Sequence, residues 1–343
     1  MPIDSYLTGL EVNSITAGVC SLVLNSLMLF MVWYMSYGEL KKYRTFFYIH
    51  NFVDFTFTFI ALSTGLIFVV EDQNMIIVTM GLITNLGPTV SQYFLLVQDS
   101  MFLLAVLIIP CTYIYRYLLI CRNYKLEKQG LIVMFSLVFL LFLGYLASLL
   151  ICLGTNANYV PEFKKNIYNV LKIDDNVQFA FFGGKMVNFD LQLTIGVGIF
   201  YVFASYVIII FCSVNIIRTL GKVGDSLSKT TRMMQRQLTV ALLVQALAPC
   251  FLYVLPMMVF GIGGIFGINF GRVILIMSAF LEWVPVCNPA ITLLCVKCYR
   301  DGLYKIVTFR FMKASMSSTS AAPQSLITTV KFTTHAGMKT TLA

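Results

Sequence analysis

Seven long apolar stretches constrain the fold of this chain more than any other feature of its sequence. They cover residues 15–34, 46–70, 90–115, 131–153, 191–217, 238–260 and 273–296. A helix needs about 20 mostly apolar residues to cross the hydrocarbon core of a bilayer, and each stretch reaches that length. Only 11% of the residues are charged, against about 25% in soluble domains. The sequence therefore predicts an all-α membrane protein built as a bundle of seven transmembrane helices.

An eighth apolar stretch, residues 75–86, is too short to count as a span and is followed by Gly87-Pro88. We predict that it forms an extracellular loop packed on the bundle, with an eighth span as the alternative. The distribution of basic residues favours seven spans. With the N-terminus outside, 19 of the 24 Lys and Arg fall on the inner side, as the positive-inside rule requires. The C-terminus is then cytoplasmic.

The segments outside the spans divide into four parts. Residues 1–14 form an extracellular N-terminus, and the long outer loop 154–190, with four Lys and four acidic residues, is expected to cover an external pocket. Residues 297–313 alternate apolar and basic side chains, which is typical of a helix lying on the inner leaflet. Residues 314–343 are rich in Ser and Thr and are predicted to be a disordered cytoplasmic tail open to phosphorylation.

Three polar residues are predicted to share one depth in the membrane. Counted at 1.5 Å per residue from the inner ends of their spans, Asn25, Asp54 and Asn288 lie roughly 12–13 Å deep. Polar side chains at that depth pair with one another or with water, because lipid offers no partner. We predict a polar coupling layer made of these three residues and Pro289, whose missing N–H interrupts the helix. The alternative is three separate residues that each bond locally to the backbone.

A second polar level lies nearer the outer face. Asp99 and Glu282 fall at similar depths, roughly nine residues from the outer ends of spans three and seven, and no basic residue lies in the outer half of a span. Two such acids would line a water-filled cavity or share a proton. We predict a ligand pocket here, with a structural network as the alternative; the candidate residues are Gln92, Tyr93, Asp99, Tyr253, Glu282 and Trp283.

The inner ends of spans three and six carry candidate residues for contact with a cytoplasmic partner. Arg116 stands within Tyr115-Arg116-Tyr117, where it either extends to the lipid headgroups or closes the cytoplasmic mouth of the bundle. Span six has a basic start with Arg232 and Arg236, and its two prolines, Pro249 and Pro256, allow a kink.

Two motifs carry a resemblance to a known family. The seven spans with Asn25, Asp54, Arg116 and Asn288-Pro289 resemble a rhodopsin-like G-protein-coupled receptor. The start of span six, residues 234–249, and the ending 288–300, which closes on Tyr299-Arg300, are similar to the nematode serpentine chemoreceptors of the Str superfamily. Within that superfamily, the Asn-Pro form is most similar to serpentine receptor class delta (Srd).

The sequence departs from the rhodopsin-like pattern at three points. The acid that precedes the Arg of that family is replaced by Tyr115. The Asn-Pro-x-x-Tyr motif ends in Thr292, and Gly87-Pro88-Thr89 stand at the top of span three, where such receptors usually carry a disulfide cysteine.

The resemblance implies a chemosensory receptor in the cell membrane of a sensory neuron, at its cilium or plasma membrane. A small environmental or pheromone-like ligand would bind between the outer halves of spans three, five, six and seven, and a heterotrimeric G protein would be activated at the inner face. The tail would serve a receptor kinase or arrestin. Cys295 and Cys298 are candidates for palmitoylation, with unmodified thiols as the alternative.

Other classes of function have less support in the sequence. With two His residues and no metal-binding or nucleophile motif, we expect no enzyme, no catalytic residue, no metal and no cofactor. The basic charge is explained by the inner loops, so no nucleic-acid partner is expected. The alternatives that remain are a subunit of a ligand-gated ion channel and, with less support, a small-molecule transporter.

Overall fold

A computed structural model describes residues 4–36, 38–173, 179–222 and 229–307 of the chain. Its contacts separate residues 1–300 from residues 301–343, and everything below concerns the first of these units, apart from the bounds of the last helix, α11 (Lys297–Val307). The predicted tail, together with residues 308–313 of the predicted juxtamembrane helix, lies outside the described residues.

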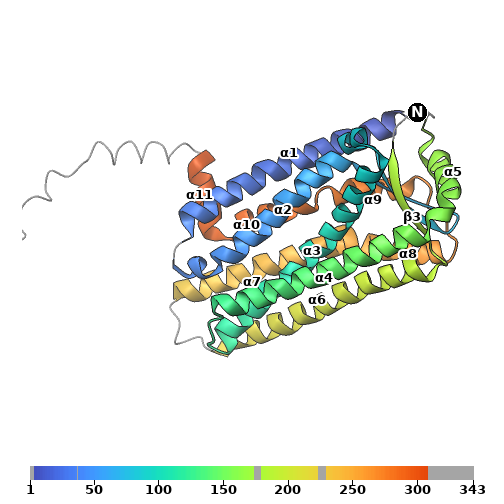
Figure 1. The fold of residues 1–343 in the computed structure, drawn as a ribbon. Helices are drawn as coiled ribbons and strands as arrows, with labels where there is room; N and C mark the ends of the chain where they lie inside the picture. Colours follow the sequence, from blue (N-terminus) through green and yellow to red (C-terminus); the bar gives the residue numbers. More distant parts are fainter. Residues whose placement is uncertain (1–3, 37, 174–178, 223–228, 308–343) are drawn as a thin grey trace, which may run out of the picture. The chain divides into compact units, whose positions relative to one another are not determined.

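Long apolar helices make up most of the fold (Figure 1). Five of them are continuous: α1 (Asp4–Met35), α2 (Arg44–Thr64), α3 (Pro88–Cys121), α4 (Lys128–Thr155) and α6 (Phe189–Lys222). The sixth span is formed by α7 (Lys229–Pro249), the π-helical turn η4 (Cys250–Val254) and α8 (Leu255–Ile265). Within the described part of the chain, six helices are long enough to cross a membrane, or seven when a bent pair is counted.

The bent pair is the last span, α9 (Val273–Leu281) with α10 (Val284–Cys295), which meet at 49°. Pro285 and Pro289 lie just after the break, and each removes an N–H from the helical ladder. In the sixth span, η4 begins directly after Pro249, which explains why this helix widens there. The kinks that the prolines predict are therefore realised as a break in one span and a π-helical turn in the other.

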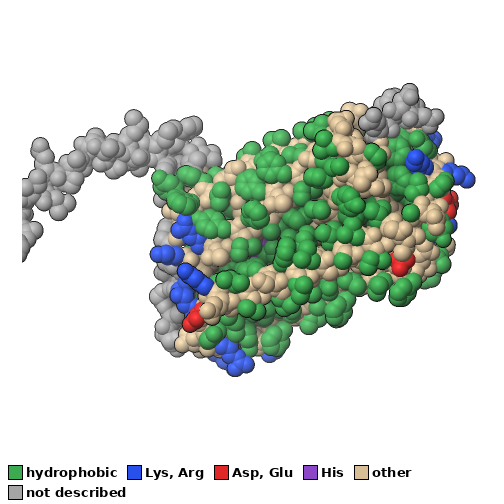
Figure 2. Space-filling view, viewed as in Figure 1, with side chains coloured by type: hydrophobic (Ala, Val, Ile, Leu, Met, Phe, Trp, Pro, Cys, Tyr) green, Lys and Arg blue, Asp and Glu red, His purple; other side chains and the backbone are tan. Residues whose placement is uncertain are grey.

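Helix α3 is the centre of the bundle. In the apolar window of α3, 83% of the residues are buried inside the protein, against 17% for α6, which lies at the edge. Hydrophobic side chains cover the length of the bundle, whereas Lys and Arg gather at its ends (Figure 2). This distribution is that of a protein whose flanks face hydrocarbon and whose ends face water.

A three-stranded antiparallel sheet lies at the end of the bundle where α1 begins. It consists of β1 (Leu66–Glu71), β2 (Asn74–Thr79) and β3 (Ala180–Lys185), with β2 in the middle. Gly65 ends α2 in the left-handed conformation (φ 55°), so that the chain leaves the helix directly into β1. The hairpin turn uses Asp72 and Gln73, both at positive φ, which matches a two-residue type I′ turn.

The sheet corrects two predictions from the sequence. We predicted a second span of residues 46–70, but α2 ends at Thr64 and the remainder is strand β1. We predicted a loop over residues 75–86, but this stretch contains β2 and the short 3₁₀ helix η2 (Leu82–Leu86). Both strands are covered on two faces, so their residues read as continuous apolar runs that are hard to distinguish from the end of a membrane helix.

The outer loop 154–190, which was expected to cover an external pocket, contains regular secondary structure. It holds the 3₁₀ turn η3 (Ala157–Tyr159), helix α5 (Val160–Leu171) and strand β3. One face of the sheet packs on α5 in a cluster that includes Ile76, Val78, Phe163 and Ile167. We call the sheet and α5 together the cap. At the opposite, inner end of the bundle, η1 (Gly38–Tyr43) leads into α2. The predicted N-terminal segment lies at the same end as the cap and is helical from Asp4 onward.

Candidate functional site

The outer half of the bundle contains a cavity of about 320 Å³, which we call the outer cavity. Its walls come from α3, α4, α6 and the η4–α8 segment, and its outer end is formed by Met75, Ile77 and Phe182 of the sheet. The carboxyl group of Asp99, which is 4% exposed, is the acidic group in its lining and accepts a hydrogen bond from the Tyr145 hydroxyl at 3.1 Å. The volume is at the small end of the range for ligand pockets.

The structure separates the two acids that the sequence placed together. Asp99 lines the outer cavity, but Glu282 does not; it lies at the break between α9 and α10 and contacts Ser14 of α1. Trp283 follows it there and donates from Nε1 to Asn13 Oδ1 at 3.1 Å. The bend turns this segment toward α1, so depth along the helix could not show which way the side chains point. The prediction of an acidic pair is wrong.

Two of the other predicted ligand residues, Gln92 and Tyr93, do not line the outer cavity. Gln92 donates to the Phe181 carbonyl at 3.0 Å and so ties α3 to β3, while Tyr93 is 52% exposed. The side chain of Tyr253 lies outside the described residues. Among the lining residues of the cavity, α4 replaces the predicted span seven as the fourth helical wall.

The predicted polar layer of Asn25, Asp54 and Asn288 is brought together in the centre of the bundle. Asn288 Nδ2 donates to both carboxyl oxygens of Asp54, at 3.1 and 3.2 Å, which joins α10 to α2. Asn25 Nδ2 donates to the Pro285 carbonyl at 3.2 Å. That carbonyl is the one that Pro289, four residues later, leaves without a helical donor. The amide of α1 therefore satisfies a backbone group that the proline of α10 has freed.

Two further polar residues extend this layer. Asn51 Nδ2 donates to the side chain of Asn25 at 3.0 Å, from a position one turn before Asp54 on α2. Gln245 of α7 donates to the Asn288 carbonyl at 2.9 Å and to Thr292 Oγ1 at 2.5 Å. The sixth and seventh spans are thus joined at the layer, and Thr292, which stands where rhodopsin-like receptors carry Tyr, is one of the joining residues.

Arg116 is fully buried at the inner end of the bundle and does not extend to the lipid headgroups. Its Nη2 donates to the Gln235 carbonyl and side-chain oxygen at 3.0 and 3.2 Å and to Thr239 Oγ1 at 2.9 Å. The guanidinium also lies 5.6 Å from the ring centre of Tyr43. We call Arg116, Gln235 and Thr239 the Arg116 cluster; its hydrogen bonds join α7 to α3 at the inner end of the bundle.

A second, much smaller cavity of about 20 Å³ separates the polar layer from the Arg116 cluster. Its lining includes Asp54, His50, Thr112, Arg116 and Gln245. This volume holds about one water molecule. The polar groups of the middle and of the inner end therefore share one small space.

Two comparisons with known proteins bear on this architecture. The family model described as serpentine type 7TM GPCR chemoreceptor Str matches residues 11–304. The chain belongs to this family.

The second comparison concerns the fold alone. The receptor is similar to the crystal structure of squid rhodopsin, with a TM-score of 0.60 and 13% sequence identity, over 89% of this chain and 81% of that chain. A search of curated proteins returned no match. The receptor is therefore a multi-pass membrane protein with the seven-helix fold of G-protein-coupled receptors.

Sequence reasoning missed Gln235, Thr239 and Gln245, which form hydrogen bonds between the sixth span of the receptor and the third and seventh spans. The first two are four residues apart and so share one helical face. That spacing of polar residues at the start of an apolar helix was the available signal. Of the predicted basic residues, Arg236 is exposed, whereas the side chain of Arg232 lies outside the described residues.

The predicted palmitoylation sites lie at the inner end of the seventh span. Cys295 and Cys298 are both free thiols of intermediate exposure, and Cys298 Sγ lies 3.4 Å from the Met35 carbonyl at the end of α1. Next to them, the Tyr299 hydroxyl and Ser36 Oγ are 2.7 Å apart. The end of the seventh span is thus fixed to the end of the first.

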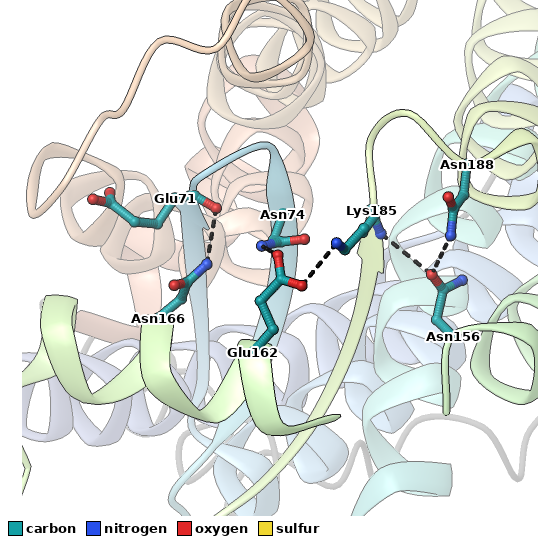
Figure 3. A network of polar contacts seen from close by, with 7 residues as sticks. All are labelled: Glu71, Asn74, Asn156, Glu162, Asn166, Lys185 and Asn188. Carbon is teal, nitrogen blue, oxygen red and sulfur yellow. Dashed lines mark hydrogen bonds and ion pairs between the residues drawn. The ribbon is translucent and has the colours of Figure 1, made fainter. Parts of the chain in front are cut away.

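A polar network holds the cap of the receptor together (Figure 3). Glu162 of α5 forms an ion pair with Lys185 of β3 at 2.7 Å and accepts a hydrogen bond from Asn74 of β2 at 3.0 Å. Asn156, after α4, accepts from the backbone N–H of Lys185 and from Asn188. Helix α5, the sheet and the end of α4 are therefore connected by side chains.

The pH dependence of the cap follows from Glu162. Hydrogen bonds from Lys185 and Asn74 lower the pKa of this carboxyl below its ordinary value. A carboxyl with a depressed folded-state pKa stabilises the fold above its unfolded pKa, and this stabilisation is lost as the pH falls through the folded pKa. We expect the protection of α5 amides against hydrogen exchange, corrected for the intrinsic exchange rate at each pH, to fall below about pH 4, and Glu162→Gln to remove this pH dependence. An equal fall in protection in the variant would exclude Glu162 as its source.

Proposed function

We propose that the receptor is a chemosensory G-protein-coupled receptor that binds a small molecule in the outer cavity and activates a heterotrimeric G protein at its inner face. The observation that carries this proposal is the Arg116 cluster. It joins the third and sixth spans through three hydrogen bonds at the end where basic residues gather. We infer that the receptor also has an open state, in which these hydrogen bonds are broken, α7 moves away from α3 and the inner surface opens.

The ligand acts by shifting the equilibrium between the closed and open states of the receptor. It must bind the open state more tightly than the closed state, because a ligand with equal affinity for both leaves their populations unchanged. The sixth span connects the outer cavity with the inner end of the bundle. Segment η4 lines the outer cavity, Gln245 of α7 joins the polar layer, and Gln235 and Thr239 form the Arg116 cluster. The sixth span thus contributes residues to the outer cavity, the polar layer and the Arg116 cluster.

Arg116 also has hydrogen-bond donors that a G protein could use. Within the described part of the chain, its Nε and Nη1 groups are buried without a hydrogen-bond partner. Buried donors without acceptors are costly, about 1–3 kcal/mol each. Backbone carbonyls of a G protein inserted at the open mouth would satisfy them. The exposed Arg236 lies beside this mouth on α7 and would contact an acidic surface of the same partner.

Several finer assignments belong to the same proposal and rest on sequence. The Asn288-Pro289 ending supports membership of serpentine receptor class delta, a nematode group, and with it expression at the ciliary or plasma membrane of a sensory neuron. The Ser- and Thr-rich tail would be the substrate of a receptor kinase and the binding site of arrestin. Acylation of Cys295 and Cys298 would add a membrane anchor.

The experiment is a calcium-response screen of volatile and water-soluble compounds in cells that express the receptor with a promiscuous G protein. Responses should disappear when the G protein is blocked. Arg116→Ala should reduce the response to near background while surface expression remains, and Arg122→Ala, an exposed arginine near the inner end of the same span, is the matched control. Currents that survive the block would instead establish an ion channel.

A further inference from the structure

The lining of the outer cavity is apolar apart from a few groups near Asp99. Its residues include Leu103, Leu149, Leu191, Ile195 and Met257, and none of the lining residues that the structure describes is Lys or Arg. The Asp99 carboxyl faces this space and has the Tyr145 hydroxyl as its hydrogen-bonding neighbour. A buried carboxylate is costly unless a cation or several donors compensate it. The cavity therefore has a place for one positive charge and a large surface for hydrocarbon.

The cap closes the outer end of this cavity. Met75, Ile77 and Phe182 point from the sheet into the cavity, and the opposite face of the sheet is covered by α5. The layers are in close contact: a Cβ added to Gly183 would lie 3.1 Å from Phe163 of α5, and one added to Gly184 would lie 3.2 Å from Cys152 and Leu191. The ion pair of Glu162 with Lys185 fixes these layers to each other (Figure 3). The cap obstructs the route from the aqueous side.

Some of the residues that line the cavity on α6 and α8 also face the lipid. Three residues line the cavity and are also exposed on the flank of the bundle: Ile199 (43%) and Phe203 (66%) of α6, and Leu255 (45%) of α8. Toward the inner end, the Tyr206 hydroxyl donates to the Ala246 carbonyl at 2.6 Å and joins α6 to α7. Above that bond, residues that line the cavity are also part of the surface that faces hydrocarbon.

We propose that the ligand of the outer cavity is a membrane-soluble amine, with an apolar body and one nitrogen, that enters sideways from the bilayer between α6 and α8. Its ammonium group pairs with the Asp99 carboxylate, and its body fills the space among α4, α6 and η4–α8. This inference rests on the proposed function in taking the outer cavity as the ligand site. It adds the chemical class of the ligand and its route.

The chemical class is tested by direct binding, which needs no G protein. The probes are 4-phenylbutylamine, 4-phenylbutanol and 4-phenylbutyric acid, which share one body and differ in the head group. With the full-length receptor in lipid nanodiscs, we expect the amine to bind about tenfold more tightly than the alcohol, and the acid most weakly. Asp99→Asn should remove the advantage of the amine. Equal affinities for the three probes, or an amine preference that survives Asp99→Asn, would overturn the proposal.

Two further variants keep this test decisive if Asp99→Asn does not fold. Tyr145→Phe retains the carboxylate and should retain the preference for the amine. Gly261→Leu should weaken all three probes together, because Gly261 lines the cavity and a Cβ at this position meets no atom within 4 Å. If Gly261→Leu leaves amine binding unchanged, the amine lies elsewhere and the proposal fails.

The route is tested by binding rates with a matched pair of variants on α6. Ile199→Trp places a larger ring at the opening, whereas Phe200→Trp makes the same change at a neighbouring residue that is 64% exposed and not part of the cavity lining. We expect Ile199→Trp to slow association of the amine about tenfold or more while Phe200→Trp matches the unmodified receptor. Equal association rates in the two variants would exclude access between α6 and α8.

The outcomes also separate this proposal from the proposed function. Amine binding that depends on Asp99 without any G-protein response would leave the cavity assignment standing and remove the G-protein coupling. A G-protein response to neutral or acidic compounds, with no amine preference, would support the G-protein coupling and overturn the assignment of an amine to the cavity.

Discussion

Replacing Thr239 by valine is expected to raise the ligand-independent activity of the receptor about tenfold. Thr239 Oγ1 accepts one of the three hydrogen bonds from Arg116 Nη2, at 2.9 Å, and valine keeps its shape while removing the acceptor. A hydrogen bond to a charged group contributes about 1.5–3 kcal/mol. Since 1.4 kcal/mol corresponds to a tenfold change in an equilibrium constant, its loss from the closed state alone shifts the population by at least that factor.

The measurement is second-messenger production without ligand, normalised to the amount of receptor at the surface. Thr56→Val is the matched control, because its hydroxyl is exposed and donates only to the Phe52 carbonyl of its own helix. Gln235→Leu should act in the same direction as Thr239→Val, by removing the side-chain acceptor of the same cluster. Unchanged basal activity in both variants, with normal surface expression, would show that the Arg116 cluster does not restrain the receptor.

The second large effect is expected at the polar layer. Asp54→Ala should lower the maximal ligand response at least tenfold while surface expression and thermal stability change little. The carboxyl accepts two hydrogen bonds from Asn288, which itself accepts through its carbonyl from Gln245 of the sixth span. Removing the carboxyl eliminates those hydrogen bonds, which lowers the free energy of unfolding. It also removes the cost of burying a charged group, which raises the free energy of unfolding, so the two effects oppose each other. Signalling has no such compensation, because the side-chain link between α2 and α10 is lost.

A reciprocal exchange distinguishes the pair from either residue alone. Asp54→Asn combined with Asn288→Asp restores one carboxyl and one amide within hydrogen-bonding distance, so it should recover more of the response than the two single variants predict. The coupling energy from this cycle is the quantity to report. A full ligand response in Asp54→Ala would remove the polar layer from the mechanism.

The polar layer was predictable because membrane depth depends only on position along a helix. Asn25, Asp54 and Asn288 were placed together by counting residues from the inner ends of three spans, and the lipid surroundings leave such groups few partners. The same argument failed for Asp99 and Glu282. Equal depth does not fix the direction of a side chain around the helix axis, and the 49° bend at Glu282 turns that acid toward α1.

Arg116 shows a related limit. Its neighbours in the sequence are tyrosines, which gave no acceptor for its charge, and both of its partners are more than 100 residues away on α7. Only the packing of α7 on α3 identifies Gln235 and Thr239 as the residues that hold it. The cap is a third case: β1 and β2 are buried on both faces, so their apolar runs were read as the end of a span and a loop.

The sequence by itself determined the seven-span architecture, the orientation and the depth of the polar residues, because apolar length, loop charge and residue count act locally along the chain. The tertiary structure decided which polar groups face each other, which walls enclose the outer cavity and what covers it. Those features depend on helix rotation, on the π-helical turn after Pro249, on the bend before Pro285, and on strand pairing across more than 100 residues. Hydropathy carries no information about any of these.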